Sequence, residues 1–208
     1  MKIGILGAGS VGKKIAALAN KAGHQVKIGL RDLAKSNPDD PWLYGTLAEA
    51  ADFGEIVMIA IPYLACADVL PALSEALAGK VVIDATNPLT PGWSPVLLGE
   101  ENSAGEEIAR LLPASLIVKA FNTVFADIML DGKIKREGQA ATVFVCSDAR
   151  ASLALVSTFV ESLGFAPVDV GPLRYSRYLE GMAHLNIQLA IGQSGGTNAA
   201  FLYHRAGS

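Results

Sequence analysis

The sequence is poor in the residues that build disulfide frameworks, metal centres and nucleic-acid surfaces. Its 208 residues include two cysteines and three histidines, and 20 acidic side chains outnumber 17 basic ones. Cys66 and Cys146 are too few for a disulfide framework and lack the spacing of metal ligands. We therefore expect reduced core thiols rather than a redox pair, and no bound metal. The net charge of −3 argues against nucleic acid or an anionic membrane as the main partner.

Long hydrophobic runs are also missing. The run Ile56–Ile61 has the length of a strand, far below the ~20 apolar residues of a membrane helix. The opening Met1–Leu6 reaches a glycine too early for a signal peptide. We therefore expect a cytoplasmic protein with no membrane partner. Hydrophobic residues still make up 51% of the chain, which suits a parallel sheet covered on both faces or a buried subunit interface.

Short apolar runs alternate with helical patterns, as is typical of βαβ units and a mainly parallel sheet. The predicted strands are Lys2–Leu6, Gln25–Leu30, Ile56–Ile61, Val81–Ala85, Leu116–Ala120, Thr142–Cys146 and Pro167–Val170. The predicted helices are Ser10–Ala22, one that begins at a Ser103–Glu106 capping box, Asp148–Leu163 and about Tyr175–Ile191. We expect an α/β fold, a single Rossmann-type, doubly wound domain over 1–208. Its dinucleotide-binding core would span 1–170, and a C-terminal helix and tail would span 171–208.

Several segments lack any periodicity. Asp32–Tyr44 is rich in Asp, Asn and Pro, and Asn87–Asn102 holds three prolines. Loops of this length in a compact domain are usually functional or mobile. Lys133–Gln139 is predicted to be a solvated connector. Gly192–Thr197 has no lysine and follows no strand, so we interpret it as a tail rather than a phosphate loop.

The strongest motif is a glycine loop that directly follows the first predicted strand and directly opens the first helix. It consists of Gly7, Ala8, Gly9, Ser10, Val11 and Gly12, a G-x-G-x-x-G pattern. In this context the first glycine permits a tight turn, the second lets a pyrophosphate approach, and the third lets the helix pack close to the strand. The backbone N–H groups of Ala8 to Val11 would face the phosphates at the positive end of the helix.

The end of the second predicted strand indicates which dinucleotide is bound. An NAD enzyme usually carries an acid there that binds the ribose 2′-hydroxyl, but this chain has Gly29 and Leu30, followed by Arg31. The planar guanidinium of Arg31 is suited to a 2′-phosphate, and Lys35 lies one turn later. NADP is therefore favoured. The alternative makes Asp32 the ribose ligand, because predicted strand ends are imprecise.

The carboxyl ends of the other strands carry amides, small residues and aromatics. We expect cofactor contacts from Ile61, Pro62, Tyr63, Asn87 and Ala126, and a catalytic role for Asn122 and Thr123. No Ser-His-Asp arrangement or metal cluster can be assembled there. Reduction of a ketone or imine normally needs a proton donor, whereas hydride exchange between two flat heterocycles needs mainly stacked rings. The amides, small residues and aromatics at these strand ends therefore favour hydride exchange between two heterocycles.

The sequence resembles the family of NADPH-dependent deazaflavin (coenzyme F420) reductases, and also the cytosolic reductase domain of the six-transmembrane metalloreductases. The resemblance is carried by Gly7–Gly12, Gly29–Arg31, Ile61–Pro62, Ser103–Ala109, Lys119–Thr123 and Gly171–Arg177. It implies a pyrophosphate on Ala8 to Val11, a 2′-phosphate on Arg31 and Lys35, and the ribose and nicotinamide along Tyr63, Asn87 and Ala126. Deazaflavin reductases carry histidine where Asn122 stands, and the metalloreductase domains carry asparagine.

Three functions remain open at this point. The favoured one is an NADPH-dependent oxidoreductase that passes hydride between NADP(H) and a small-molecule electron carrier, with a flavin or deazaflavin as co-substrate. The alternatives are a dehydrogenase of a small ketone, imine or hydroxy acid, and a non-catalytic NADP sensor. The last apolar helix and the segment Gly192–Tyr203 also carry more apolar surface than one small domain should expose, so we expect a homodimer.

Overall fold

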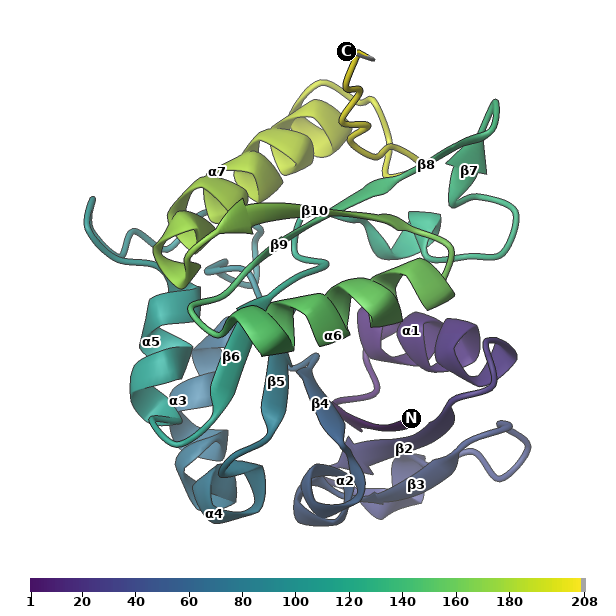
Figure 1. Cartoon of the computed structure of the whole chain (residues 1–208), viewed down its shortest axis with the longest axis vertical. Coiled ribbons are helices and arrows are strands. Elements are labelled where there is room, and N and C mark those ends of the chain that lie inside the picture. The colour runs from purple at the N-terminus through teal and green to yellow at the C-terminus, as the bar shows by residue number, and fades with distance from the viewer. Residues whose placement is uncertain (207–208) are drawn as a thin grey trace.

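The computed structural model describes residues 1–206 and is built around an eight-stranded sheet (Figure 1). The strands are β1 (Lys2–Leu6), β2 (Gln25–Leu30), β3 (Leu43–Thr46), β4 (Ile56–Ile59), β5 (Val81–Asp84), β6 (Leu116–Lys119), β9 (Thr142–Cys146) and β10 (Ala166–Gly171). Their spatial order is β10-β9-β6-β5-β4-β1-β2-β3. The six strands from β3 to β6 are parallel, and the β9–β10 pair is joined to β6 in the antiparallel sense. This is the predicted doubly wound α/β fold.

Helices cover both faces of the sheet. They are α1 (Ser10–Lys21), α2 (Leu47–Phe53), α3 (Cys66–Val69), α4 (Ser74–Leu77), α5 (Ala104–Leu111), α6 (Arg150–Ser162) and α7 (Ser176–Ile187). Alternate residues of β1 divide the core into two halves. Ile3 and Ile5 pack with α1 and α6, which lie side by side in Figure 1, whereas Leu6 packs with the helices of the other face. Both faces are thus buried, as the apolar composition predicted.

All seven predicted strands are confirmed, with ends that shift by one or two residues. Three short strands, β3 and two in the segment 135–140, and three short helices, α2, α3 and α4, were not predicted. The supposedly aperiodic Asp32–Tyr44 runs into the short edge strand β3, and α2 follows it at once. Thr46 and Glu49 form a capping box at the start of α2, a signal that the sequence carried. Lys133–Gln139 is exposed except for Ile134, as expected of a solvated connector, but it also contains β7 (Lys135–Arg136), which pairs with β8 (Gln139–Ala140).

The capping box predicted at Ser103 is only half formed. The Ser103 hydroxyl accepts the N–H of Glu106 at 3.2 Å and caps α5. The Glu106 carboxylate does not return to the Ser103 backbone. Instead it accepts two hydrogen bonds from Arg177 of α7, at 2.7 and 2.8 Å. The Ser103 hydroxyl still donates to Glu106 Oε2 at 2.7 Å, so the local contact is kept, and the added ion pair ties α5 to α7.

The C-terminal helix is confirmed in α7, but it ends as an α-helix at Ile187. A wider turn of the π type continues to Gly192, and residues 193–206 are irregular. Gly207 and Ser208, the last residues of the predicted tail, lie outside the described residues. Within 1–206, no helix has the length and apolar character to cross a membrane. No group of three or more potential ligands in the same residues is placed to hold a metal ion.

Candidate active site

The glycine loop connects β1 to α1, and its three glycines meet different surroundings. Gly7 has a φ of +112°, and a Cβ there would lie 2.7 Å from the carbonyl oxygen of Ala60. A Cβ on Gly12 would lie 2.2 Å from the carbonyl oxygen of Gly7, so α1 can pack only on a glycine. A Cβ on Gly9 would meet nothing closer than 4.0 Å. The fold requires the first and third glycines, whereas the space over Gly9 is free for a ligand.

A first cavity of about 460 Å³ opens beside this loop. It lies at the carboxyl ends of β1, β2 and β4, where the strand order reverses, which is where open α/β sheets bind dinucleotides. Eight predicted cofactor residues line it, namely Gly7, Ala8, Gly9, Leu30, Arg31, Lys35, Ile61 and Pro62. Asp32, the alternative ribose ligand of the sequence analysis, also lines it, and the remaining lining residues are Gly29 and three that were not predicted, Lys13, Leu47 and Ala60.

Three cations face this first cavity, and its one acid is engaged elsewhere. Lys13, Arg31 and Lys35 all belong to its lining. Asp32 Oδ1 accepts the N–H of Ala34 at 3.1 Å and caps the short turn that follows β2. The charge of the wall is thus positive, which suits a phosphate group. A ribose hydroxyl alone would not need three cations.

A second cavity of about 400 Å³ lies on the other side of the glycine loop. Ser10 and Val11 reach it from the loop, and four more predicted residues, Asn87, Asn122, Thr123 and Ala126, lie in its wall. Further lining comes from residues that the sequence analysis did not select, among them Trp93, Asp127, Asn186 and Thr197. Tyr63 lies in the lining of neither cavity. Its cofactor contact remains a prediction.

Two asparagines hold each other in the wall of the second cavity. Asn122 Nδ2 donates to Asn87 Oδ1 and to the carbonyl oxygen of Leu179, both at 3.0 Å. Asn87 Nδ2 donates to the carbonyl oxygen of Asn122 at 2.7 Å. The two hydrogen bonds donated by Asn122 Nδ2 fix the orientation of its side-chain amide. Asn122 is 6% exposed, and within residues 1–206 its Oδ1 has no hydrogen-bond partner. A buried acceptor in this state is short of a donor.

A buried ion triad stands behind the second cavity. Lys119 Nζ lies 2.8 Å from Asp84 Oδ2 and 2.8 Å from Glu180 Oε1, and it also donates to the carbonyl oxygen of Thr86. Burial by itself lowers the pKa of Lys119, but the two carboxylates outweigh it and raise that pKa above its ordinary value. The lysine is therefore charged. The sequence analysis missed this triad, because its members come from two strands and a distant helix.

Glu180 connects the triad to two helices. Its carboxylate accepts the N–H groups of Ala104 and Gly105 at the start of α5, at 3.0 and 3.1 Å, while the residue itself belongs to α7. Through this link α7 is fixed against β5 and β6. The same helix supplies the Leu179 carbonyl to Asn122, and Asn186, which donates to the carbonyl oxygen of Thr123 at 3.1 Å. The triad thus positions the amides of the second cavity.

The C-terminal tail returns to the second cavity. Thr197 donates to Asp127 Oδ2 at 2.6 Å, and Lys14 of α1 pairs with Asp127 Oδ1 at 3.0 Å. The hydroxyl of Thr197 and the ammonium of Lys14 lower the pKa of Asp127. Residues after Gly192 therefore form part of the wall, which the interpretation of this segment as a tail did not include.

The fold and the two cavities define a nicotinamide-dinucleotide oxidoreductase. The family model for coenzyme F420-dependent NADP oxidoreductases matches residues 2–88. The chain is 33% identical to the F420-dependent NADP reductase of Methanothermobacter marburgensis, and the match covers 92% of this chain and 93% of that protein. It therefore belongs to the F420-dependent NADP reductase family.

Solved structures agree with this assignment. A crystal structure of a candidate F420-dependent NADP reductase from Arthrobacter sp. FB24 has a TM-score of 0.88 and 33% identity, with 99% of this chain and all of that chain covered. The chain is also 30% identical to Metalloreductase STEAP3 of Rattus norvegicus over 86% of its own length. It spans only 36% of that relative, so the activity of the whole metalloreductase is not carried over.

Proposed function

We propose that this protein passes hydride between NADP(H) and a deazaflavin carrier of the F420 type. The observation that carries the proposal is the pair of cavities on either side of one glycine loop. The first cavity has a cationic wall, and the second has paired amides. Gly9 and Ser10 are neighbours in the chain but line different cavities, so one extended dinucleotide reaches both.

The first cavity would hold the adenosine half of the dinucleotide. The N–H groups of Ala8 to Val11 lie at the start of α1, where the helix dipole is positive, and the open space over Gly9 admits the pyrophosphate. Arg31, Lys35 and Lys13 would bind the 2′-phosphate. The three cations of the wall support NADP over NAD, and one oxygen of the Asp32 carboxylate already caps the turn at Ala34.

The second cavity would hold the nicotinamide and the ring of the carrier. The bound dinucleotide supplies a hydride and becomes NADP⁺, while the carrier gains that hydride and one proton from solvent. The protein contributes by holding the two rings at near-attack distance and excluding water. Asn122 and Thr123 would orient the rings through the amide and the backbone, with Asn87 holding Asn122 in place. Ala126 would lie along the nicotinamide.

A flavin is the second candidate for the carrier. The metalloreductase domains that this sequence resembles carry asparagine at the position of Asn122, and the similarity to STEAP3 extends over 86% of this chain. The walls of the second cavity do not distinguish a flavin from a deazaflavin by charge, because both are flat heterocycles with amide-like edges.

A substrate panel tests the proposal directly. NADPH oxidation is followed at ~340 nm with a deazaflavin, a free flavin, a ferric chelate and simple ketones or imines. We expect turnover with the deazaflavin. Faster turnover with the free flavin would identify a flavin as the carrier instead. Turnover with carbonyl compounds alone would establish the dehydrogenase alternative. Tight NADPH binding without turnover of any acceptor would establish the sensor.

We further propose a cytoplasmic homodimer, in which a second copy covers the outer face of α7. Tyr178 and Leu185 on α7, and Leu189 and Ile191 after it, are large apolar side chains that are exposed. A second copy would cover these apolar side chains. Light scattering at micromolar concentration should give twice the monomer mass, and a Leu185→Lys, Leu189→Lys variant should give the monomer mass with NADPH affinity unchanged. A monomeric wild type would contradict the dimer.

A further inference from the structure

The segment between β5 and α5 presents a tryptophan to the second cavity. We propose that Trp93 is a specificity-determining residue that stacks on the ring system of the hydride carrier. The inference rests on the proposed function, since it concerns the acceptor of that reaction. The ligand class is a fused, planar heterocycle with an N–H edge, which small ketones and imines lack.

The backbone on either side of Trp93 forms a hydrogen-bonded hairpin. Leu89 and Pro95 form an antiparallel bridge, Val96 donates to the carbonyl oxygen of Pro88 at 2.8 Å, and Thr90 donates to that of Ser94 at 2.8 Å. Trp93 itself donates to the carbonyl oxygen of Thr90 at 2.9 Å. The long loop predicted at Asn87–Asn102 therefore has a defined conformation around Pro88–Val96, and Trp93 lies near the tip of its turn.

The backbone of Trp93 adopts a conformation that favours glycine. Its φ is +66°, which is strained for a residue with a Cβ and is uncommon for a bulky side chain. Strain of this kind collects at ligand sites, where the surrounding structure maintains it. Here the hairpin maintains the strained backbone of Trp93, and the residue lines the second cavity.

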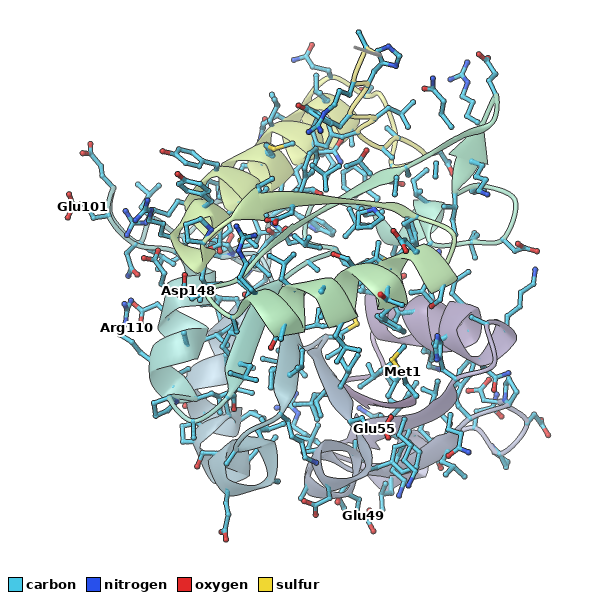
Figure 2. The ribbon with its side chains drawn as sticks, in the orientation of Figure 1. Met1, Glu49, Glu55, Glu101, Arg110 and Asp148 are labelled. Atoms are coloured by element: carbon cyan, nitrogen blue, oxygen red, sulfur yellow. The ribbon has the colours of Figure 1, made fainter. Side chains whose placement is uncertain are left out.

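The indole has a free face. Trp93 is 52% exposed although it lines the second cavity, and among residues 1–206 no aromatic ring or cation is paired with it. Flat heterocycles stack on such faces with an offset geometry and gain from the contact. Near the end of the same segment, Glu101 is absent from the lining of the cavity, and Figure 2 shows it at the outer margin of the molecule, on the side of Arg110 of α5.

The unpartnered oxygen of Asn122 adds a polar group to the wall that Trp93 lines. It is a buried hydrogen-bond acceptor in the wall that Trp93 also lines, and it lacks an N–H donor. The nicotinamide carboxamide and the imide-like edges of flavins and deazaflavins supply such donors. A ketone supplies none. The amide acceptor suits either ring, so the stacking surface of Trp93 is the feature that selects a fused heterocycle as the carrier.

The chain offers matched controls for a test. It contains two tryptophans, and the other, Trp42, lies at a separate hollow beside the start of β2. A Trp42→Phe background therefore leaves Trp93 as the only indole reporter. Leu97 lies on the same segment as Trp93, is 88% exposed and lines neither cavity, so Leu97→Ala controls for general effects on the loop.

The experiment titrates the single-tryptophan protein with oxidised deazaflavin in the presence of saturating NADP⁺, and then measures steady-state kinetics. We expect saturable quenching of Trp93 emission by the carrier. In Trp93→Leu the KM for the carrier should rise about tenfold, the gain expected from one aromatic stack, while the KM for NADPH and the melting temperature stay unchanged. Trp93→Phe should retain most of the carrier affinity, and Leu97→Ala should behave as wild type.

The outcomes separate this inference from the proposed function. An unchanged KM for the carrier in Trp93→Leu, with normal wild-type turnover, overturns the role of Trp93 and leaves the function intact. Equal rises in the KM for NADPH and for the carrier also overturn it, since they indicate a general effect on the site. Saturable quenching without turnover supports the assignment of Trp93 and overturns hydride transfer. The absence of both quenching and turnover overturns both proposals.

Discussion

The two cavities are built in different ways. The first is formed around one short continuous stretch, Gly7–Gly9, with Leu30, Arg31 and Lys35 from the end of β2 and the turn after it. The second is assembled from side chains that are far apart in the sequence, such as Asn87, Asn122 and Asn186. The buried ion triad around Lys119 fixes the elements that carry these side chains relative to one another. A local motif therefore specifies dinucleotide binding, whereas the acceptor site depends on tertiary packing. The predictions below test that division.

The largest effect is expected from the triad. Lys119→Met leaves two buried carboxylates without their cation, which should cost about 3–5 kcal/mol of unfolding free energy. Urea unfolding measures this cost, and Lys135→Met, at an exposed position on β7, should change stability little. A fully stable Lys119→Met protein would show that the second cavity does not depend on the triad.

The triad also predicts a pH dependence. The pKa of Lys119 is raised in the folded protein, so its contribution to stability is complete below the unfolded pKa of ~10.4 and fades as the pH rises beyond that value. Unfolding free energies at neutral pH and at increasing alkaline pH should show this loss in the wild type. In Lys119→Met this component should be absent.

The glycine loop should separate folding from binding. Gly12→Ala places a Cβ against the carbonyl oxygen of Gly7 and should cost about 1–3 kcal/mol or more of stability. Gly9→Ala meets no protein atom closer than 4.0 Å, so its melting temperature should stay near that of the wild type while NADPH binding is lost. If Gly9→Ala binds NADPH normally by calorimetry, the pyrophosphate does not lie over Gly9.

The cationic wall should distinguish the two dinucleotides. Arg31→Ala should weaken NADPH binding by about 1.5–3 kcal/mol, the range for a hydrogen bond to a charged group, and should hardly affect NADH. Binding constants for both cofactors measure the difference. Equal losses for NADPH and NADH would reject the contact of Arg31 with the 2′-phosphate and would favour the alternative in which Asp32 binds the ribose.

The smallest effect is expected at the thiols. Burial raises the pKa of Cys66 and of Cys146 to about 12, so both stay protonated at pH 8 in the folded protein. Neither should react with iodoacetamide before unfolding, because the thiolate is the nucleophile. Both should react in urea. Rapid alkylation of the native protein would show that one of the thiols is accessible.

Much of the first cavity could be predicted from the sequence because its determinants are local. The strand before Gly7, the helix that begins at Ser10 and the position of Arg31 follow from periodicity and from glycine chemistry. The edge strand β3 and the short helix α2 were missed because they are too brief to show a period, although the Thr46–Glu49 cap gave a signal. Local sequence signals were therefore sufficient where residues close together in the sequence form the binding site.

The second cavity could be predicted only in part. Asn87 and Asn122 stand at strand ends, so a rule about sheet edges selects them. Asn186 and Thr197 come from a helix and a tail whose return to the site depends on the pairing of Lys119 with Glu180, which no local pattern shows. Trp93 looked like one residue of an aperiodic loop, because its backbone conformation is visible only in the structure.

Isotope transfer tests the central claim most directly. NADPH carrying deuterium at the transferred position of its nicotinamide ring is oxidised by the wild-type protein with the deazaflavin, and the reduced carrier is analysed by mass spectrometry. If the two rings stack in the second cavity, the label moves to a carbon of the carrier without passing through water. Label released to solvent, or oxidation of NADPH that does not need the carrier, would contradict this account.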